Sequence, residues 1–374
     1  SGIRLIRKRV FDEEEEVITE DGLIDIYDYK FDDDADETVE VQQQEKVASQ
    51  NEVPRDTIIQ KPSSSFRIPE QRNYNLAFAA TDFTAQFDFN YATELYQRYN
   101  GGPYIAAGLG PFLKLGIQDV FEDYQVDGGF RYSFQNSGNE IFLSLIDRSK
   151  RWDKRYIFQR QVMDVELPLF RYGRNEIYQL KGIFKYPIDE VNAFQFTGTA
   201  RYDRQITYAR STPAELTESD ETDFWLGLKA EYIFDNTLFK SLNILNGARA
   251  KAWAEHYRAA IDPDLHTTVV GFDGRHYQRI YRDIIWANRL AGSSSFGTRK
   301  LVYYLGSVDN WMVLNQSGDA DPRFDRSTNI ANDPSYYFQT IATNMRGFKQ
   351  NVRNGNNFVV LNSEIRWPIV RFFT

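Results

Sequence analysis

The stretch VNAFQFTGTARYDR (191–204) decides the fold class, because its side chains alternate between two chemical types. One set of positions holds aromatic or small residues: Phe194, Phe196, Gly198, Ala200 and Tyr202. The other set is polar: Gln195, Thr197, Thr199, Arg201 and Asp203. Successive side chains of a β-strand point to opposite faces, so this segment is predicted to be a strand with one apolar and one polar face.

The same period of two recurs along most of the chain. It is clearest in 176–186, 223–233, 247–255 and 358–367, and further strands are expected near 112–121, 125–134, 140–148, 153–163, 266–281 and 284–296. Four turn-like sequences punctuate these segments: NSGN (136–139), RYGRN (171–175), FDNT (234–237) and FDG (272–274). The pattern predicts an all-β chain with about eleven or twelve antiparallel strands.

The apolar faces indicate that these strands cross a membrane. Each face covers about nine to eleven residues, the length that a tilted strand needs to span a bilayer. Phe, Tyr and Trp make up 15% of the residues although the mean hydropathy is -0.54. A water-exposed face this rich in aromatic residues would favour aggregation. Because a lipid-facing sheet must close on itself, we predict a transmembrane β-barrel; the alternative is a soluble β protein such as a carbohydrate binder.

The acidic charge of the chain is concentrated in one segment. Residues 11–40 contain 15 acidic residues and one basic residue, Lys30, whereas the whole chain has a net charge of -9. We predict an acidic, largely disordered linker with the end of an upstream domain at 1–75, a lead-in segment at 76–110 and the barrel at 111–374. The chain opens SGIRLIRKRV, without Met, so we expect it to be an internal piece of a longer protein.

The sequence contains no recognisable catalytic or metal-binding motif. It has no Cys, and its three histidines, His256, His266 and His276, are ten residues apart, which is not zinc-site spacing. They are predicted to be strand-end residues at the membrane interface. No Gly-x-Ser-x-Gly or phosphate-binding motif occurs. We therefore predict a protein that is not an enzyme and has no cofactor or metal; a barrel lipase or protease is the alternative.

Three segments occur in an order that points to a known family. A hydrophobic-Arg-Gly-Phe motif is formed by Met345, Arg346, Gly347 and Phe348, and LNSEIRWPI (361–369) follows it with Asn362, Glu364, Arg366 and Pro368. The hairpin AEYIFDNTLFKSLNILNGARAKAWAE (230–255) has Asp235, Asn236 and Gly247 at its turn positions, and RKLVYYLGSVDNW (299–311) lies between hairpin and motif. Over residues 105–374 the chain resembles the BamA/TamA superfamily of bacterial surface-antigen outer-membrane barrels.

The resemblance implies a sixteen-stranded barrel that is truncated at the C-terminus of this chain. At the N-terminus, where an acidic spacer precedes the barrel, the chain resembles the Bacteroidota form, in which a Tol-like β-propeller precedes the barrel. A loop at 306–356 would fold into the lumen, where Arg346 would need a carboxylate partner, Gly347 would allow a tight turn and Phe348 would anchor the loop tip.

The resemblance also implies a location and a function. The chain would lie in the outer membrane of a Gram-negative bacterium and would insert or translocate polypeptides without covalent chemistry. Its partners would be outer-membrane lipid, unfolded or partly folded protein clients, and periplasmic or lipoprotein components, with no nucleic acid. The alternative is a passive pore or surface antigen without insertase activity.

Overall fold

The computed structural model describes residues 76–134, 137–167, 171–209, 215, 217–241, 243–308, 322–330 and 333–368. All of them belong to one compact unit, Arg72–Thr374. The predicted linker at 1–75 lies outside the described residues. No helix in the described part of the chain is long and apolar enough to span a membrane.

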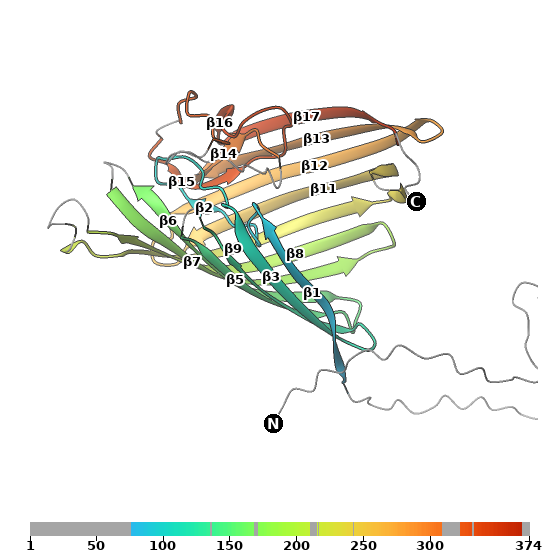
Figure 1. Ribbon diagram of the computed structural model, residues 1–374, viewed down its shortest axis with the longest axis horizontal. Helices are drawn as coiled ribbons and strands as arrows, with labels where there is room; N and C mark the ends of the chain where they lie inside the picture. Colours follow the sequence, from blue (N-terminus) through green and yellow to red (C-terminus); the bar gives the residue numbers. More distant parts are fainter. Residues whose placement is uncertain are drawn as a thin grey trace, which may run out of the picture. The chain divides into compact units, whose positions relative to one another are not determined.

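Most of the described residues form one large antiparallel sheet of 13 strands (Figure 1). Twelve of them follow one another across the sheet: β1 (Phe78–Asp88), β3 (Gly110–Asp119), β4 (Tyr124–Tyr132), β5 (Asn139–Asp147), β6 (Asp153–Leu167), β7 (Arg171–Pro187), β8 (Asn192–Thr207), β9 (Glu221–Asp235), β11 (Ile244–Ala259), β12 (His266–Tyr281), β13 (Ile284–Gly297) and β17 (Asn357–Arg366). The thirteenth, β10 (Leu238–Ser241), pairs only with β11. The predicted all-β, antiparallel character is therefore confirmed.

The sheet begins earlier than the sequence pattern indicated. β1 lies inside the predicted lead-in segment 76–110 and pairs with β3. The register shifts between Ala80 and Asp82, which marks a bulge. One extra residue moves the apolar set from Phe78 and Ala80 to Phe83, Ala85 and Phe87, so the period of two breaks within the strand.

Two of the predicted turns are wrong. RYGRN (171–175) opens β7, and FDG (272–274) lies in the middle of β12. Gly173 serves close packing, because a Cβ there would collide with the carbonyl of Ile206 on the neighbouring strand β8. A glycine in a strand marks close backbone approach as readily as it marks a turn.

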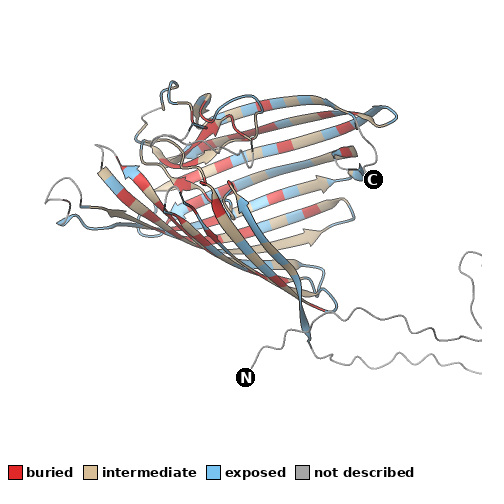
Figure 2. Ribbon diagram, viewed as in Figure 1, coloured by how far each residue is buried: buried red, intermediate tan, exposed pale blue. Residues whose placement is uncertain are grey.

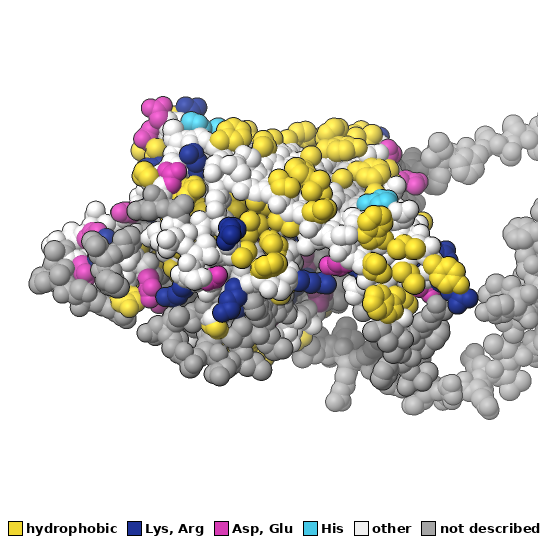
Figure 3. Space-filling model, turned by 90° about the horizontal axis from the view of Figure 1, so that it is seen from above, with side chains coloured by type: hydrophobic (Ala, Val, Ile, Leu, Met, Phe, Trp, Pro, Cys, Tyr) yellow, Lys and Arg dark blue, Asp and Glu magenta, His cyan; other side chains and the backbone are white. Residues whose placement is uncertain are grey.

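The two faces of the large sheet are inverted relative to a soluble protein (Figure 2). On the outer face Phe194, Phe196, Leu226 and Leu228 are 44%, 49%, 51% and 74% exposed. On the inner face polar side chains such as Arg201 are buried. Hydrophobic side chains gather accordingly over one surface of the molecule (Figure 3). The predicted assignment of residues to the two faces agrees with these exposures.

The sheet curls but is not closed among the described residues (Figure 1). β1 pairs only with β3 and β17 pairs only with β13, so each is an edge. The structure thus shows a large curved antiparallel sheet, and the predicted closed barrel is not seen.

A second, four-stranded sheet lies on the inner side of the large one, near one end of its strands (Figure 1). Its strands are β16 (Arg353–Gly355), β14 (Lys300–Leu305), β15 (Tyr336–Ile341) and β2 (Gln97–Arg98), in that order. β14 and β15 run parallel, which requires the long connection between them. The small sheet is built from distant parts of the sequence: β15 and β16 come from the predicted lumen loop 306–356, β14 directly precedes that loop, and β2 comes from the lead-in segment.

Candidate functional site on the inner face

The small sheet is held against the large sheet by an aromatic cluster. Trp225 of β9 is fully buried, and its ring centroid lies 5.0 Å from that of Tyr337 and 5.2 Å from that of Phe338, both on β15. Tyr257 of β11 and Val269 of β12 complete the wall beneath these rings. Burying such aromatic surface contributes most of the stabilisation of a contact of this kind.

Charged groups fix the same contact. The guanidinium of Arg201 lies 4.9 Å from the Phe338 ring centroid, and its Nε donates to Asp203 at 2.9 Å. It also donates to the carbonyl of Tyr96 in the lead-in segment at 2.6 Å. The pairing with Asp203 offsets the cost of burying the arginine charge. Both segments of the small sheet are therefore tied to the inner face of β8.

The lead-in segment makes further polar contacts with the large sheet. Arg98 of β2 forms salt bridges with Glu221 and Asp223 at the start of β9. The Tyr96 hydroxyl donates to Glu255 of β11 at 2.9 Å. These contacts reach residues more than 120 positions away in sequence, so the segment crosses the inner face as a fixed element.

The predicted motif residues lie in a backbone clamp at the far end of the loop. The amide of Met345 donates to the carbonyl of Ser307 at 2.9 Å, and the Ser307 amide donates to the carbonyl of Phe348 at 3.0 Å. Gly347 has φ +85°, and Gly306 has φ +108° with its Cα against the carbonyl of Lys349. Both backbone conformations favour glycine, so the two ends of the loop meet because of these residues.

Arg346 faces the strand that follows the loop. Its guanidinium lies 3.5 Å from Glu364 of β17, although 78% of the Arg346 side chain is exposed. Arg366 donates to the other oxygen of the same carboxylate at 2.9 and 3.0 Å. The structure therefore brings together the two motifs that the sequence pattern linked, with Glu364 between two arginines.

The remaining predicted residues are placed as follows. Phe348 is half-exposed, Asn362 is the Cα partner of Arg289 on β13, and Pro368 follows the end of β17. In the hairpin, Asn236 accepts from the Ala248 amide at 2.7 Å, and Asp235 accepts from Thr237. Gly247 has φ +109°, and a Cβ there would lie 2.7 Å from the Asn236 carbonyl oxygen. Asp235 ends β9, Asn236 follows it, and Gly247 lies within β11, so the three residues stand together where β9 and β11 begin to pair; β10 lies in the connection between them.

Sequence reasoning missed the residues that dock the small sheet: Trp225, Tyr257, Tyr337 and Phe338. One signal was available. Trp225 occupies a polar-face position between Phe224 and Leu226, where an indole is out of place in a wet lumen. An aromatic residue on a polar face indicates that another part of the chain covers that face.

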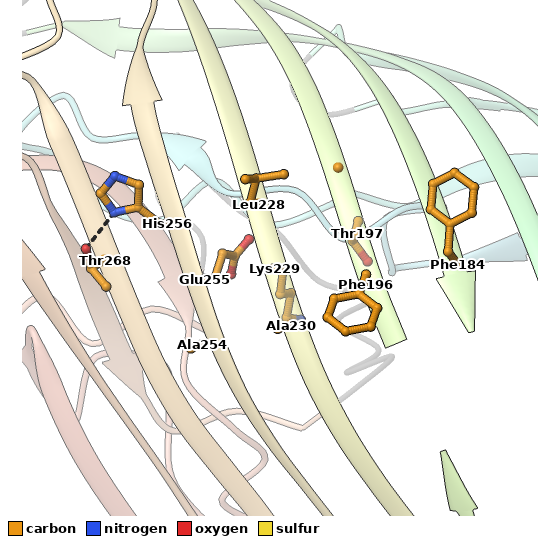
Figure 4. Close-up of a pocket in the computed structure, with 11 residues that line it drawn as sticks. Phe184, Phe196, Thr197, Leu228, Lys229, Ala230, Ala254, Glu255, His256 and Thr268 are labelled. Atoms are coloured by element: carbon orange, nitrogen blue, oxygen red, sulfur yellow. Dashed lines mark hydrogen bonds between the residues drawn. The ribbon is translucent and has the colours of Figure 1, made fainter. Parts of the chain in front are cut away.

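The outer face carries a shallow depression of about 430 Å³ (Figure 4). Small residues form its floor, with Gly198, Ala230 and Ala254 on three neighbouring strands. Phe184, Phe196 and Leu228 border it, and His256 lies toward one end with its Nδ1 2.8 Å from the Thr268 hydroxyl. The depression is continuous with the exposed apolar face.

Burial and hydrogen bonding shift the pKa values of groups in the lead-in segment and in the loop. Desolvation raises the pKa of Tyr91 and Tyr104, both in the lead-in segment, well above their ordinary values. In the loop, the Ser335 hydroxyl and amide lower the pKa of the Asp333 carboxyl by donating to it at 2.7 and 2.9 Å. These groups therefore keep their ordinary charge at neutral pH.

The described residues contain no group of three His, Asp or Glu side chains that could hold a metal ion. His256 and His266 lie near each other on the outer face, with ring centroids 5.9 Å apart. In comparisons with known proteins, no protein-family model matches the chain, and no curated protein matches it either.

Proposed function

We propose that this protein is an outer-membrane β-barrel of the assembly or translocation type, which inserts or passes polypeptide clients without covalent chemistry. The observation that carries the proposal is the inverted sheet, with an exposed apolar outer face and a buried polar inner face. In water that outer face would be an aggregation site, whereas in lipid it is the ordinary surface of a barrel.

The connections between strands support one orientation in the membrane. At one end of the sheet they are short, at 120–123, 148–152, 188–191 and 282–283. At the other end three are long, at 89–109, 208–220 and 298–356, and three are short, at 133–138, 168–170 and 260–265. Bacterial barrels have short periplasmic turns and long extracellular loops, so the small sheet would lie toward the extracellular side.

Closure of the barrel follows from the same physics. Lipid leaves no partner for unpaired backbone groups, so β1 and β17 both need neighbouring strands in a membrane. The proposal therefore requires further polypeptide to pair with these two edges. A strand edge that can exchange partners also offers a client main-chain pairing without demanding a particular sequence.

The assembly or translocation role is favoured over a passive pore by the covered inner face. Two chain segments fill the inner side near one end of the strands, and the Arg346–Glu364 pair joins the loop to the wall. An open pore has no need of a docked sheet across its lumen.

The experiment is catalysed insertion. The full-length protein is reconstituted in lipid vesicles, and the folding of a urea-unfolded barrel client is followed by its heat-dependent gel migration. We expect client folding to be several-fold faster than in empty vesicles, and slower with Arg346→Ala. Arg258→Ala, which removes an exposed outer-face arginine, should leave the rate unchanged.

The outcome against the proposal is equally clear. Equal client folding with and without the protein, accompanied by steady conductance in planar bilayers, would establish the passive pore instead.

A further inference from the structure

Three arginines lie side by side on the inner face of adjacent strands. Arg249 of β11 is the Cα partner of Arg275 of β12, and Arg275 is the Cα partner of Arg289 of β13. These three strands are neighbours in the large sheet (Figure 1). Like charges directly opposite each other destabilise a sheet. The arrangement therefore needs a compensating anion, and the protein supplies only part of one.

The Asp273 carboxylate lies against two of these arginines, Arg275 and Arg289. Asp273 of β12 is 8% exposed and accepts from Arg275 at 3.0 Å and from Arg289 at 2.6 Å. Arg275 and Arg289 remain 31% and 24% exposed. The acid is thus covered by the two cations that it binds, and the accessible surface at this point is cationic.

Two more cations have a carboxylate opposite them but at a longer distance: Arg249 is the Cα partner of Asp235 on β9, and Lys251 is the Cα partner of Asp273. Within the described residues, neither Arg249 nor Lys251 forms a salt bridge. Arg249 instead lies 5.9 Å from the Tyr277 ring centroid, and Lys251 lies 5.2 Å from that of Trp253. Their charges are held over aromatic rings and their hydrogen-bond donors stay available.

We call these groups, with the loop and β17 residues next to them, the basic inner patch. It contains six basic residues, Arg249, Lys251, Arg275, Arg289, Arg346 and Arg366, and three acidic ones, Asp235, Asp273 and Glu364. Six positive and three negative charges leave an excess of +3. Its cations in the sheet lie on four adjacent strands, β11, β12, β13 and β17, a width of roughly 14 Å at about 4.8 Å per strand spacing.

We propose that the basic inner patch binds an acidic segment of a polypeptide client. A single phosphate or carboxylate would satisfy one or two cations, whereas an extended segment of about four residues spans the whole width. Trp253, which is only partly buried, lies among the cations and gives such a segment an apolar contact between its carboxylates. The proposal rests on the proposed function, since it names the chemistry of the client that this lumen accepts.

The test measures binding alone, so that it can fail separately from client insertion. The full-length protein in detergent is titrated into a fluorescein-labelled peptide of about twenty residues rich in Glu, and anisotropy is recorded over a range of salt concentrations. We expect Arg249→Gln and Lys251→Gln each to weaken binding about tenfold, the equivalent of one charge-assisted hydrogen bond, and to flatten the salt dependence.

Matched controls separate the patch from general basicity. Arg258→Gln removes an arginine from the outer face and should bind the peptide like the parent protein. A Lys-rich peptide can bind the acidic segment 11–40, but its affinity should not fall in Arg249→Gln or Lys251→Gln. Arg249→Glu, with unchanged heat-dependent gel migration as proof of folding, should lose more affinity than Arg249→Gln.

Three results would overturn the inference. They are equal affinity in the parent protein and both patch variants, an equal loss in Arg258→Gln, and binding of a single-stranded oligonucleotide as tight as that of the acidic peptide. Catalysed client insertion without any effect of the patch variants would leave the proposed function standing and remove this inference.

Discussion

Single residues on the inner face show how closely neighbouring strands of the sheet fit. Gly129, Gly227 and Gly271 each face an aromatic ring from the next strand, namely Phe142, Tyr257 and Trp253. A Cβ at any of these positions would collide with that ring. The rings lie across the glycines and cover backbone that would otherwise be bare, a known device for fixing register in curved sheets.

Gly227→Ala should therefore destabilise the protein. The Tyr257 ring is 4% exposed and packs in the cluster under the small sheet, so it has little room to move. We expect a loss of about 1–3 kcal/mol, typical of overpacking, in urea unfolding followed by tryptophan fluorescence.

Gly198→Ala is the matched control for this substitution. A Cβ there meets nothing within 4 Å, and its φ is not in the left-handed region. We expect a neutral or slightly stabilising effect, because alanine restricts the unfolded chain more than glycine does. Equal losses at the two positions would show that the collision with the Tyr257 ring is not the cause.

At the scale of the strand, β9 carries the contrast between the two faces most clearly. Leu226 and Leu228 point outward, while Trp225 and Gly227, which alternate with them, are buried. The same strand therefore meets two environments, and a substitution on its outer face reports on what lies outside the protein.

Leu228→Arg distinguishes lipid from water. Leu228 lies at the centre of β9 and is 74% exposed. In a bilayer an arginine at mid-depth costs about 2–4 kcal/mol, whereas at an exposed position in water it would cost close to nothing. The measurement is the folding free energy of the reconstituted protein in lipid vesicles.

Ile261→Arg is the control, since Ile261 is 81% exposed and lies in the connection between β11 and β12. Near the membrane surface the same change costs about 0–1 kcal/mol. If both variants lose equally little, the outer face does not contact lipid and the membrane proposal fails.

At the scale of the whole molecule, the docked small sheet covers part of the inner face of the large sheet. Its contact depends on Trp225, whose ring meets two rings of β15. The indole nitrogen of Trp225 is buried without a described partner, so packing and not hydrogen bonding holds this residue. Such a contact can be loosened without disturbing the strands around it.

We expect Trp225→Ala to release the small sheet. Removing a buried tryptophan costs about 3–5 kcal/mol, enough to populate an undocked state. The prediction is faster proteolysis within 306–356 and larger, noisier currents in planar bilayers. Phe196→Ala removes a ring of the outer face and should change neither reading; unchanged proteolysis of Trp225→Ala would mean that other contacts hold the sheet.

The sequence by itself determined the strands, their two faces and the hairpin at Asp235, Asn236 and Gly247. Each follows from local physics, because side-chain alternation and turn chemistry depend on neighbouring residues alone. Where local geometry was irregular, as at the bulge in β1, the same reasoning failed. It failed again at Gly173 and Gly274, whose strand positions are set by the neighbouring strands.

Only the tertiary structure decided which distant segments meet. Trp225 and Phe338 are more than a hundred residues apart, and Arg249, Arg275 and Arg289 line up only in one strand register. Shifting a strand by one residue would send each of these side chains to the other face, and no pattern within a single strand specifies what lies opposite. The aromatic cluster that holds the small sheet and the basic inner patch are therefore set by the tertiary structure. The alternation of side chains that builds their strands is set by the sequence.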